Sequence, residues 1–402
     1  MVGRLACGWL AVALLGGCGG GETEAFPPVD ELPSILDPPP VLESASADDW
    51  SARRAEIAEL LDHYVYGGTP ESVPATGTEA APILDVEGGR YVEVTVRYGP
   101  AAAPPIVLGL FLPEGVSRSP VMLALNKCGN HSLTTDPRIP ESTAWAAESC
   151  ADESGETRGA RASLFPVARI LERGYALATF HESDVDPDDA SDRDRSDGIH
   201  PHLPVEGDAP WGTLAAWAYG VSRAVDYLES SSLVDGARIA TVGHSRRGKV
   251  ALLAAARDPR IAMAIPHQSG TGGVTLSRSD GGESVMAITL FFPHWFTPGF
   301  ADFAGEEARL PLDQHFLVAM VAPRPLLAVD GVDDFWADPP GARRSIELAD
   351  EVWELLGSEG AVELGDGTFD LTADLAWTTR PGEHSMVASD WEIFLDFADA
   401  HF

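Results

Sequence analysis

The stretch that decides the fold is Arg238-Ile-Ala-Thr-Val-Gly-His-Ser-Arg-Arg-Gly-Lys249, an apolar strand that runs into a glycine-flanked serine and then into a helix. Small residues are needed beside such a serine because backbone segments approach closely at a sharp turn. The turn also aims backbone N–H groups and a helix N-terminus at an oxyanion forming nearby. We therefore expect Ser245 to be a nucleophile, and the alternative is an ordinary structural serine in a tight turn.

Outward from this turn, apolar strands alternate with amphipathic helices. We expect strands at residues 90–98, 106–112, 121–126, 175–180, 238–242, 261–266, 325–330 and 375–379, and helices at 51–64, 166–173, 211–229, 249–257 and 352–356. This alternation predicts an α/β fold with a mostly parallel central sheet and helices on both faces, a three-layer sandwich. Together with the serine turn it is typical of the α/β-hydrolase fold. The first two strands have no helix between them, which predicts an antiparallel edge.

A serine nucleophile requires a base and an acid that orients the base. In α/β-hydrolases these follow in the order serine, acid, histidine. Here Asp333 and Asp334 follow the strand at 325–330, and His384 follows the last strand, so order and spacing fit. His294 and His315 lie in aromatic or apolar contexts that favour a core role.

The N-terminus has the pattern of an exported lipoprotein. Residues 1–17 read as a signal peptide, with one arginine followed by an apolar run. Leu15-Gly-Gly-Cys18 resembles a lipobox, which predicts Cys18 as the lipidated residue, and a plain signal peptide is the alternative. Residues 18–48 are rich in Gly, Pro and Glu and predict a flexible tether. Residues 49–402 then form one catalytic domain. We expect a periplasmic or outer-membrane-anchored protein, with an extracellular location as an alternative.

Two further cysteines remain after Cys7 and Cys18. In an oxidising compartment Cys128 and Cys150 are expected to pair as a disulfide, with two separate buried thiols as the alternative. There is no CxxC motif or Cys/His cluster in the sequence, so no metal and no cofactor are expected.

The chain of 402 residues carries 27 Lys and Arg against 62 Asp and Glu, a formal charge of −35. This charge excludes nucleic acid and anionic membrane surfaces as partners, because phosphate binding depends on clustered cations. We expect a monomer that contacts the membrane only through its N-terminal lipid. The acidic exterior favours solubility, while Arg246, Arg247, Lys249 and Arg278 suggest a basic pocket.

Several motifs resemble those of one family, the glucuronoyl esterases of carbohydrate esterase family 15, especially its bacterial members. The likeness spans about residues 50–402 and rests on Gly129-Asn-His131, Asp197-Gly-Ile-His-Pro201, Gly-His-Ser-Arg-Arg-Gly-Lys (243–249), Ser269-Gly-Thr-Gly-Gly273, Phe292-Pro-His-Trp-Phe296, Asp313-Gln-His315, Ala322-Pro-Arg-Pro325, Trp336-Ala-Asp-Pro339 and Gly382-Glu-His384. The resemblance implies a serine esterase that needs no metal and cleaves the ester between glucuronic acid of xylan and a lignin alcohol.

The same resemblance implies roles for individual residues. Ser245 resembles the nucleophile and His384 the base, while Arg246 resembles the arginine of the oxyanion hole. Substrate-binding roles are implied for Lys249, Glu283 and Trp336.

One position departs from the family pattern. Many members carry a glutamate about 23 residues after the serine, and here that position is Gln268. A neutral amide can hold the histidine ring or contact substrate, but it cannot offset the imidazolium charge. We therefore assign the triad acid to Asp334; the alternatives are Asp333, Asp338 or no acid at all.

Two segments have open interpretations. Residues 184–198 are dense in Asp, and we expect a solvated surface loop rather than a calcium site, because the EF-hand register is absent. The aromatic run 291–296 is expected to be core rather than the wall of a lignin-side pocket.

Two other functions remain as alternatives to a glucuronoyl esterase. The first is an acetyl- or feruloyl-xylan esterase, and the second is a lipoprotein that binds acidic polysaccharide without turnover.

Overall fold

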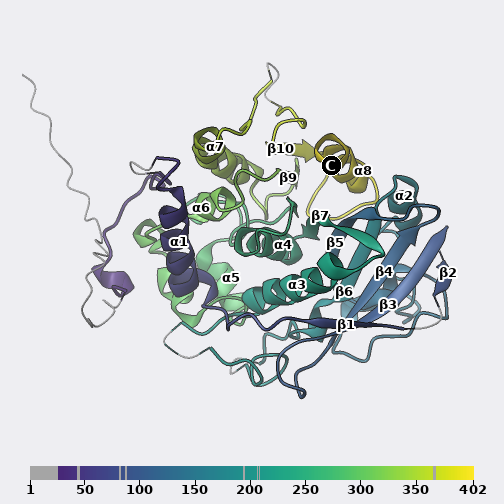
Figure 1. The fold of residues 1–402 in the computed structure, drawn as a ribbon. Helices are drawn as coiled ribbons and strands as arrows, with labels where there is room; N and C mark the ends of the chain where they lie inside the picture. The colour runs from purple at the N-terminus through teal and green to yellow at the C-terminus, as the bar shows by residue number, and fades with distance from the viewer. Residues whose placement is uncertain are drawn as a thin grey trace, which may run out of the picture.

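A ten-stranded sheet runs through the centre of the computed structural model, which describes residues 26–402 except 43–45, 81–82, 87, 193–194, 206, 208 and 365–367 (Figure 1). The strand order is β1-β3-β4-β6-β5-β7-β8-β9-β10, and β2 pairs with β3. The strands are β1 Thr76–Glu79, β2 Leu84–Val86, β3 Gly89–Arg97, β4 Ile106–Pro113, β5 Ser119–Asn126, β6 Ala176–His181, β7 Val234–His244, β8 Met263–His267, β9 Leu326–Gly331 and β10 Leu375–Arg380.

The sheet changes from antiparallel to parallel along its width. Strands β1 to β4 and the β4–β6 pair are antiparallel, while every pair from β6 through β5, β7, β8 and β9 to β10 is parallel. The predicted antiparallel edge is therefore confirmed, and it is widened by β1 and β2, which we did not expect. Because six neighbouring strands run in the same direction, their carboxyl ends meet along one side of the sheet.

Helices cover both faces of the sheet, as predicted for a three-layer α/β fold. One face packs against α2 and α8 through buried side chains that include Ile170, Trp391 and Phe394, and the other packs against α1, α3, α4, α6 and α7. The helices are α1 Trp50–Leu61, α2 Val167–Glu172, α3 Thr213–Ser230, α4 Arg246–Arg257, α5 Val285–Phe291, α6 Gln314–Ala319, α7 Pro339–Leu355 and α8 Asp390–His401. None of the described helices has the length and apolar character needed to cross a membrane.

The expected tether, residues 18–48, is not flexible throughout. The signal peptide and Cys18 lie outside the described residues, but residues 26–42 form a strap that packs on the domain beside α1 and α6. Val41 is fully buried in the main core, and the Pro39 carbonyl lies 2.8 Å from His315 Nε2. The strap is held because its apolar side chains fill sites on the helices and its carbonyls have donors there.

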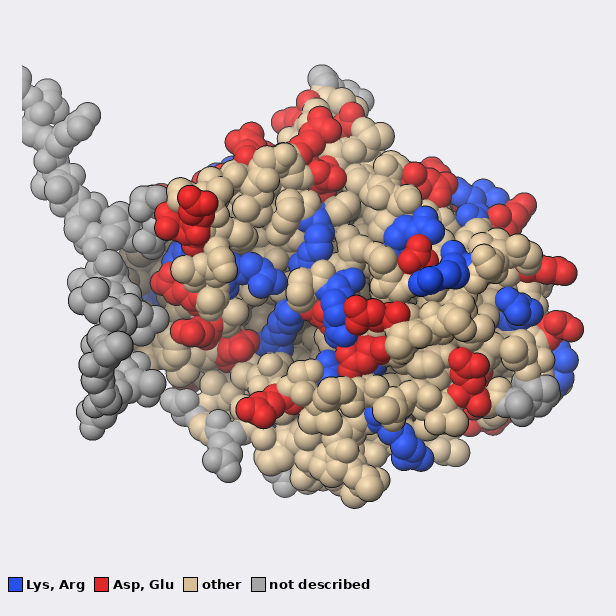
Figure 2. Space-filling model, viewed as in Figure 1, with Lys and Arg blue, Asp and Glu red and all other residues tan. Residues whose placement is uncertain are grey.

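Charge on the described surface agrees with an acidic exterior. Figure 2 shows Asp and Glu side chains spread over the visible face, with Lys and Arg interleaved among them. The prediction of a basic pocket formed by Arg246, Arg247, Lys249 and Arg278 is only partly correct. Arg278 pairs with buried Asp313 and donates to the Leu312 carbonyl, 2.9 Å away, so it belongs to the structural core rather than to a pocket.

The strap should contribute to stability through Val41. We expect Val41→Ala to lower the free energy of unfolding by about 1–2 kcal/mol, because it leaves a cavity where a side chain was fully buried. Leu36→Ala is the matched control, since Leu36 lies on the same strap and is 84% exposed. Denaturant unfolding measures both variants, and equal effects would contradict a docked strap.

Candidate active site

Ser245 lies on a strained turn between β7 and α4. Its backbone has φ 59° and ψ −127°, a conformation that non-glycine residues rarely adopt, and its N–H donates to the His267 carbonyl at 2.9 Å. A Cβ at Gly243 would lie 2.1 Å from the Arg247 carbonyl oxygen, and one at Gly248 would lie 2.8 Å from the Gly243 oxygen. The two glycines are therefore required for the turn, which presents the serine hydroxyl at the end of the strand.

Two loops bring a histidine and a carboxylate to this serine. His384, after β10, has its Nε2 2.9 Å from Ser245 Oγ and its Nδ1 2.8 Å from Asp334 Oδ2. Asp334, after β9, is buried, and its Oδ1 accepts hydrogen bonds from the N–H groups of Trp336 and Ala337. An ionised carboxylate only accepts, so the Nδ1 of His384 carries the proton and its Nε2 is free to accept one.

The two alternative acids are placed elsewhere. Asp333 is exposed, and Asp338 is buried and accepts a hydrogen bond from Ser279. Neither carboxylate is paired with His384.

Gln268 braces the histidine loop instead of contacting the ring. Its Nε2 donates to the Glu383 carbonyl and its Oε1 accepts from the Ser385 N–H, both at 3.0 Å. The side chain is fully buried, and both ends of its amide are used by the two residues that flank His384. The amide of Gln268 is therefore hydrogen-bonded to backbone on both sides of His384, and the residue also lines the pocket beside Ser245.

Arg246, the residue after Ser245, is held in place from three sides. Its guanidinium forms an ion pair with Asp188 and lies 4.7 Å from the ring centre of Phe292 and 4.4 Å from that of Trp295. Asp188 in turn lies 3.0 Å from His294 Nε2 and accepts from Trp295 Nε1 at 2.9 Å. Burial would raise the pKa of Asp188, but the His294 hydrogen bond and the arginine charge outweigh it and hold this pKa well below its usual range.

These contacts correct two of the expectations from the sequence. The segment 184–198 is not simply a solvated loop, because Asp184 and Asp186 are buried and Asp188 anchors Arg246. Among the described residues there is no group of three or more His, Cys, Asp or Glu side chains that could hold a metal ion. The aromatic run 291–296 is mixed: Phe296 is core, whereas Phe292 and Trp295 line the catalytic pocket.

The candidate catalytic pocket, called the catalytic pocket below, is a cavity of about 370 Å³ beside Ser245. It is lined by all of the other residues predicted for catalysis and substrate binding except Asp334. Lys249, on the first turn of α4, donates to the carbonyls of Ser269 and Thr271, each at 2.6 Å, and its burial lowers its pKa to about 8. Burial raises the pKa of Glu283, whose Oε1 has no hydrogen-bond partner in the described part of the chain. Trp336 is 48% exposed at the rim.

Three features of the site were missed in the sequence. Glu182, after β6, is 1% exposed and forms an ion pair with Arg247 at 2.7 Å. His244 has its ring centre 4.8 Å from that of His384. Lys127, after β5, also lines the pocket. A signal for Lys127 was available, because Lys127 and Lys249 are the only lysines in the sequence, against 25 arginines.

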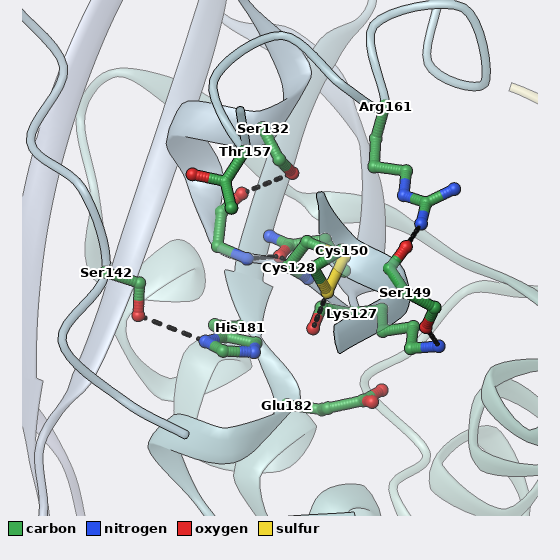
Figure 3. Close-up of a disulfide and its surroundings, with 12 residues drawn as sticks. Lys127, Cys128, Ser132, Ser142, Ser149, Cys150, Thr157, Arg161, His181 and Glu182 are labelled. Atoms are coloured by element: carbon green, nitrogen blue, oxygen red, sulfur yellow. Dashed lines mark hydrogen bonds between the residues drawn. A yellow bond between two sulfur atoms is a disulfide. The ribbon is translucent and has the colours of Figure 1, made fainter. Parts of the chain in front are cut away.

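The disulfide between Cys128 and Cys150 is formed in the structure, with the two Cα atoms 5.4 Å apart. It ties the loop after β5 to the segment around Ser149 (Figure 3). Because Lys127 directly precedes Cys128, the bond fixes the backbone beside one wall of the catalytic pocket.

Comparisons with known proteins agree with this geometry. A family model described as "Glucuronyl esterase, fungi" matches residues 162–357. Carbohydrate esterase MZ0003, from an unknown prokaryotic organism, is 34% identical over 94% of this chain and 91% of its own length. The 4-O-methyl-glucuronoyl methylesterase 1 of Wolfiporia cocos is 30% identical over 80% of this chain and 72% of its own.

Solved structures give the same result. The structure of a promiscuous CE15 esterase from a marine bacterial metagenome has a TM-score of 0.83 and 33% identity, and covers 93% of this chain and 99% of that one. The glucuronoyl esterase from Solibacter usitatus has a TM-score of 0.80 and 33% identity, with 93% of this chain and 100% of that one covered. The chain therefore belongs to the glucuronoyl esterases of carbohydrate esterase family 15 and has the α/β-hydrolase fold predicted from its sequence.

Proposed function

We propose that this protein is a serine esterase that hydrolyses the ester between glucuronic acid, or its 4-O-methyl form, and lignin alcohols in glucuronoxylan. The observation that carries the proposal is the Asp334–His384–Ser245 chain of contacts at 2.8 and 2.9 Å, opening into a pocket that holds Arg246, Lys249 and Glu283. Family membership supplies the substrate class. The charged and aromatic side chains that line this pocket can hydrogen-bond to and pack against a hydroxylated sugar ring.

In the proposed mechanism, Ser245 Oγ attacks the ester carbonyl carbon while His384 Nε2 takes the hydroxyl proton. Asp334 stabilises the imidazolium that forms. The carbonyl oxygen becomes an oxyanion opposite the Arg246 guanidinium and backbone N–H groups at the start of α4. When the C–O bond of the ester breaks, His384 returns the proton to the alcohol. Water then repeats the cycle and releases the uronic acid.

The sugar would be held by the side of the pocket that contains Lys249. The Lys249 ammonium and the Glu283 carboxyl are both buried there, so each gains from a hydroxyl partner. Trp336 offers an apolar face to the ring. An acetyl- or feruloyl-xylan esterase would make less use of these groups. A non-catalytic lipoprotein that binds polysaccharide would not need the contacts that His384 makes with Ser245 and Asp334.

Export as a lipoprotein is part of the same proposal. Lipidation of Cys18 after removal of residues 1–17 would place a monomeric enzyme at the periplasmic or outer-membrane surface. The Cys128–Cys150 disulfide supports an oxidising compartment. No metal or cofactor enters the proposed mechanism.

The different roles proposed for Asp334, which pairs with His384, and for Gln268, which hydrogen-bonds the backbone beside it, can be tested directly. We expect Asp334→Asn to lower kcat by about 10³–10⁴-fold, because an amide can hold the ring but cannot offset the imidazolium charge. Gln268→Ala should cost far less in kcat, because its amide is hydrogen-bonded to backbone and not to the His384 ring. Steady-state kinetics on a benzyl glucuronate ester measures both, and equal losses would show that the assignment of the acid is wrong.

Substrate class is tested by comparing alcohol release from benzyl glucuronate with hydrolysis of acetyl and feruloyl esters. We expect glucuronate to be preferred and Ser245→Ala to abolish turnover of all of them. Activity on acetate or ferulate without activity on glucuronate would overturn the proposed function.

Binding through Lys249 should depend on pH. Because burial lowers its pKa to about 8, its ammonium loses a proton as the pH rises through that value. We expect KM for the glucuronate ester to rise above pH 8 in the wild type. Lys249→Met should have a higher KM that stays constant over the same range. A rise of the same size in both proteins would assign the pH dependence to another group.

A further inference from the structure

A second cavity opens beside the catalytic pocket and shares Lys127, His244 and Arg247 with it. This side cavity has a volume of about 320 Å³, within the range of small-ligand sites. Its walls are apolar at Leu164, Phe165 and Met386, and polar at Ser149 and Arg161.

We infer that the side cavity binds the alcohol half of the ester, and that Lys127 selects aryl alcohols that carry an oxygen substituent on the ring. This inference rests on the proposed function and deepens it, because it assigns a place and a recognition group to the leaving alcohol.

The position of the cavity relative to His384 supports the alcohol rather than the sugar. The leaving alkoxide oxygen must take its proton from His384 Nε2, so the alcohol has to lie beside the His384 ring. His244, whose ring centre is 4.8 Å from that of His384, lines the side cavity, as does Met386, two residues further along the chain.

The sheet order places the two lysines on opposite sides of the nucleophile. Ser245 ends β7, whose neighbours are β5 and β8. Lys127 follows β5, while Lys249 is bound to carbonyls in the loop after β8. A uronate held by Lys249 would therefore direct its ester group, and the alcohol beyond it, toward Lys127.

Lys127 lines both cavities and is available there as a donor. Arg247 is committed to buried Glu182, and Arg161 donates to the Ser149 carbonyl. The Lys127 ammonium donates to Ser149 Oγ at 2.5 Å, which occupies one of its three N–H groups (Figure 3). A phenol or ether oxygen would accept from the remaining donors.

The residue type is itself informative. Twenty-five of the 27 cations are arginine, and both lysines line the catalytic pocket. A compact ammonium fits a single oxygen, whereas a guanidinium is wide and planar and prefers two acceptors. The disulfide at Cys128 fixes the backbone next to Lys127, as a recognition role requires.

The test compares kcat/KM for the methyl, benzyl and para-methoxybenzyl esters of glucuronic acid. All three give the same acyl-enzyme, so differences in kcat/KM report only on the alcohol. We expect Lys127→Met to lower kcat/KM about tenfold for the methoxybenzyl ester and less than twofold for the methyl ester. Lys127→Arg keeps the charge and should lose part of the same preference.

The apolar wall is tested by Leu164→Asn, which should reduce kcat/KM for both aryl esters relative to the methyl ester. Arg344→Met, which removes an exposed cation of α7, is the control and should change none of the three values. Equal losses on all three esters in Lys127→Met, or no loss, would overturn this inference and leave the esterase function intact. A wild-type enzyme that hydrolyses acetyl esters but none of the glucuronates would overturn the proposed function, and this inference with it.

Discussion

The left-handed backbone of Ser245 is the constraint on which the rest of the site depends. It is possible only because Gly243 and Gly248 have no side chains where β7 and α4 meet. Conformations of this kind cost about 1–3 kcal/mol and persist only where the surrounding structure enforces them. Here the Ser245 N–H donates to the His267 carbonyl, and the Ser245 carbonyl accepts from the N–H groups of Gly248 and Lys249. These bonds hold the turn, so the hydroxyl lies at the edge where the parallel strands end.

That edge collects one contribution from each of the six parallel strands. Going through the sheet, the residues at or just beyond the strand ends are Glu182 of β6, Lys127 of β5, Ser245 of β7, Gln268 of β8, Asp334 of β9 and His384 of β10. Residues far apart in the sequence meet because parallel strands align their carboxyl ends. The sheet sets their order, and hydrogen bonds between loops set the final geometry, as Gln268 does for the backbone on both sides of His384.

Local sequence predicted the turn at Ser245, the strands near it, and His384 and Asp334, which the structure places in one chain of contacts with Ser245. Each of these follows from a turn or a strand end, which short-range patterns report well. The carboxylates that form ion pairs with Arg246 and Arg247 could not be predicted from local sequence. Asp188 is more than fifty residues from Arg246, in a segment whose acidic composition indicated a solvated loop, and its burial depends on contacts with His294 and Trp295. The prediction of a flexible tether failed for the same reason, since the Pro-rich composition of the strap does not reveal that Val41 has a buried site.

The net charge of −35 does not describe the site itself, where the ion pairs of individual arginines decide the local charge. Arg246, Arg247 and Arg278 each form an ion pair with a carboxylate, so the pairs add no net charge to this region. The two lysines are bound instead to neutral oxygens, those of Ser149, Ser269 and Thr271. Neither ammonium group forms an ion pair within the described part of the chain, and one lies on each side of Ser245. An ester has a hydroxylated acyl half and an alcohol half that meet at one carbonyl, and the proposed nucleophile lies between two donors, one for each of the proposed binding sites.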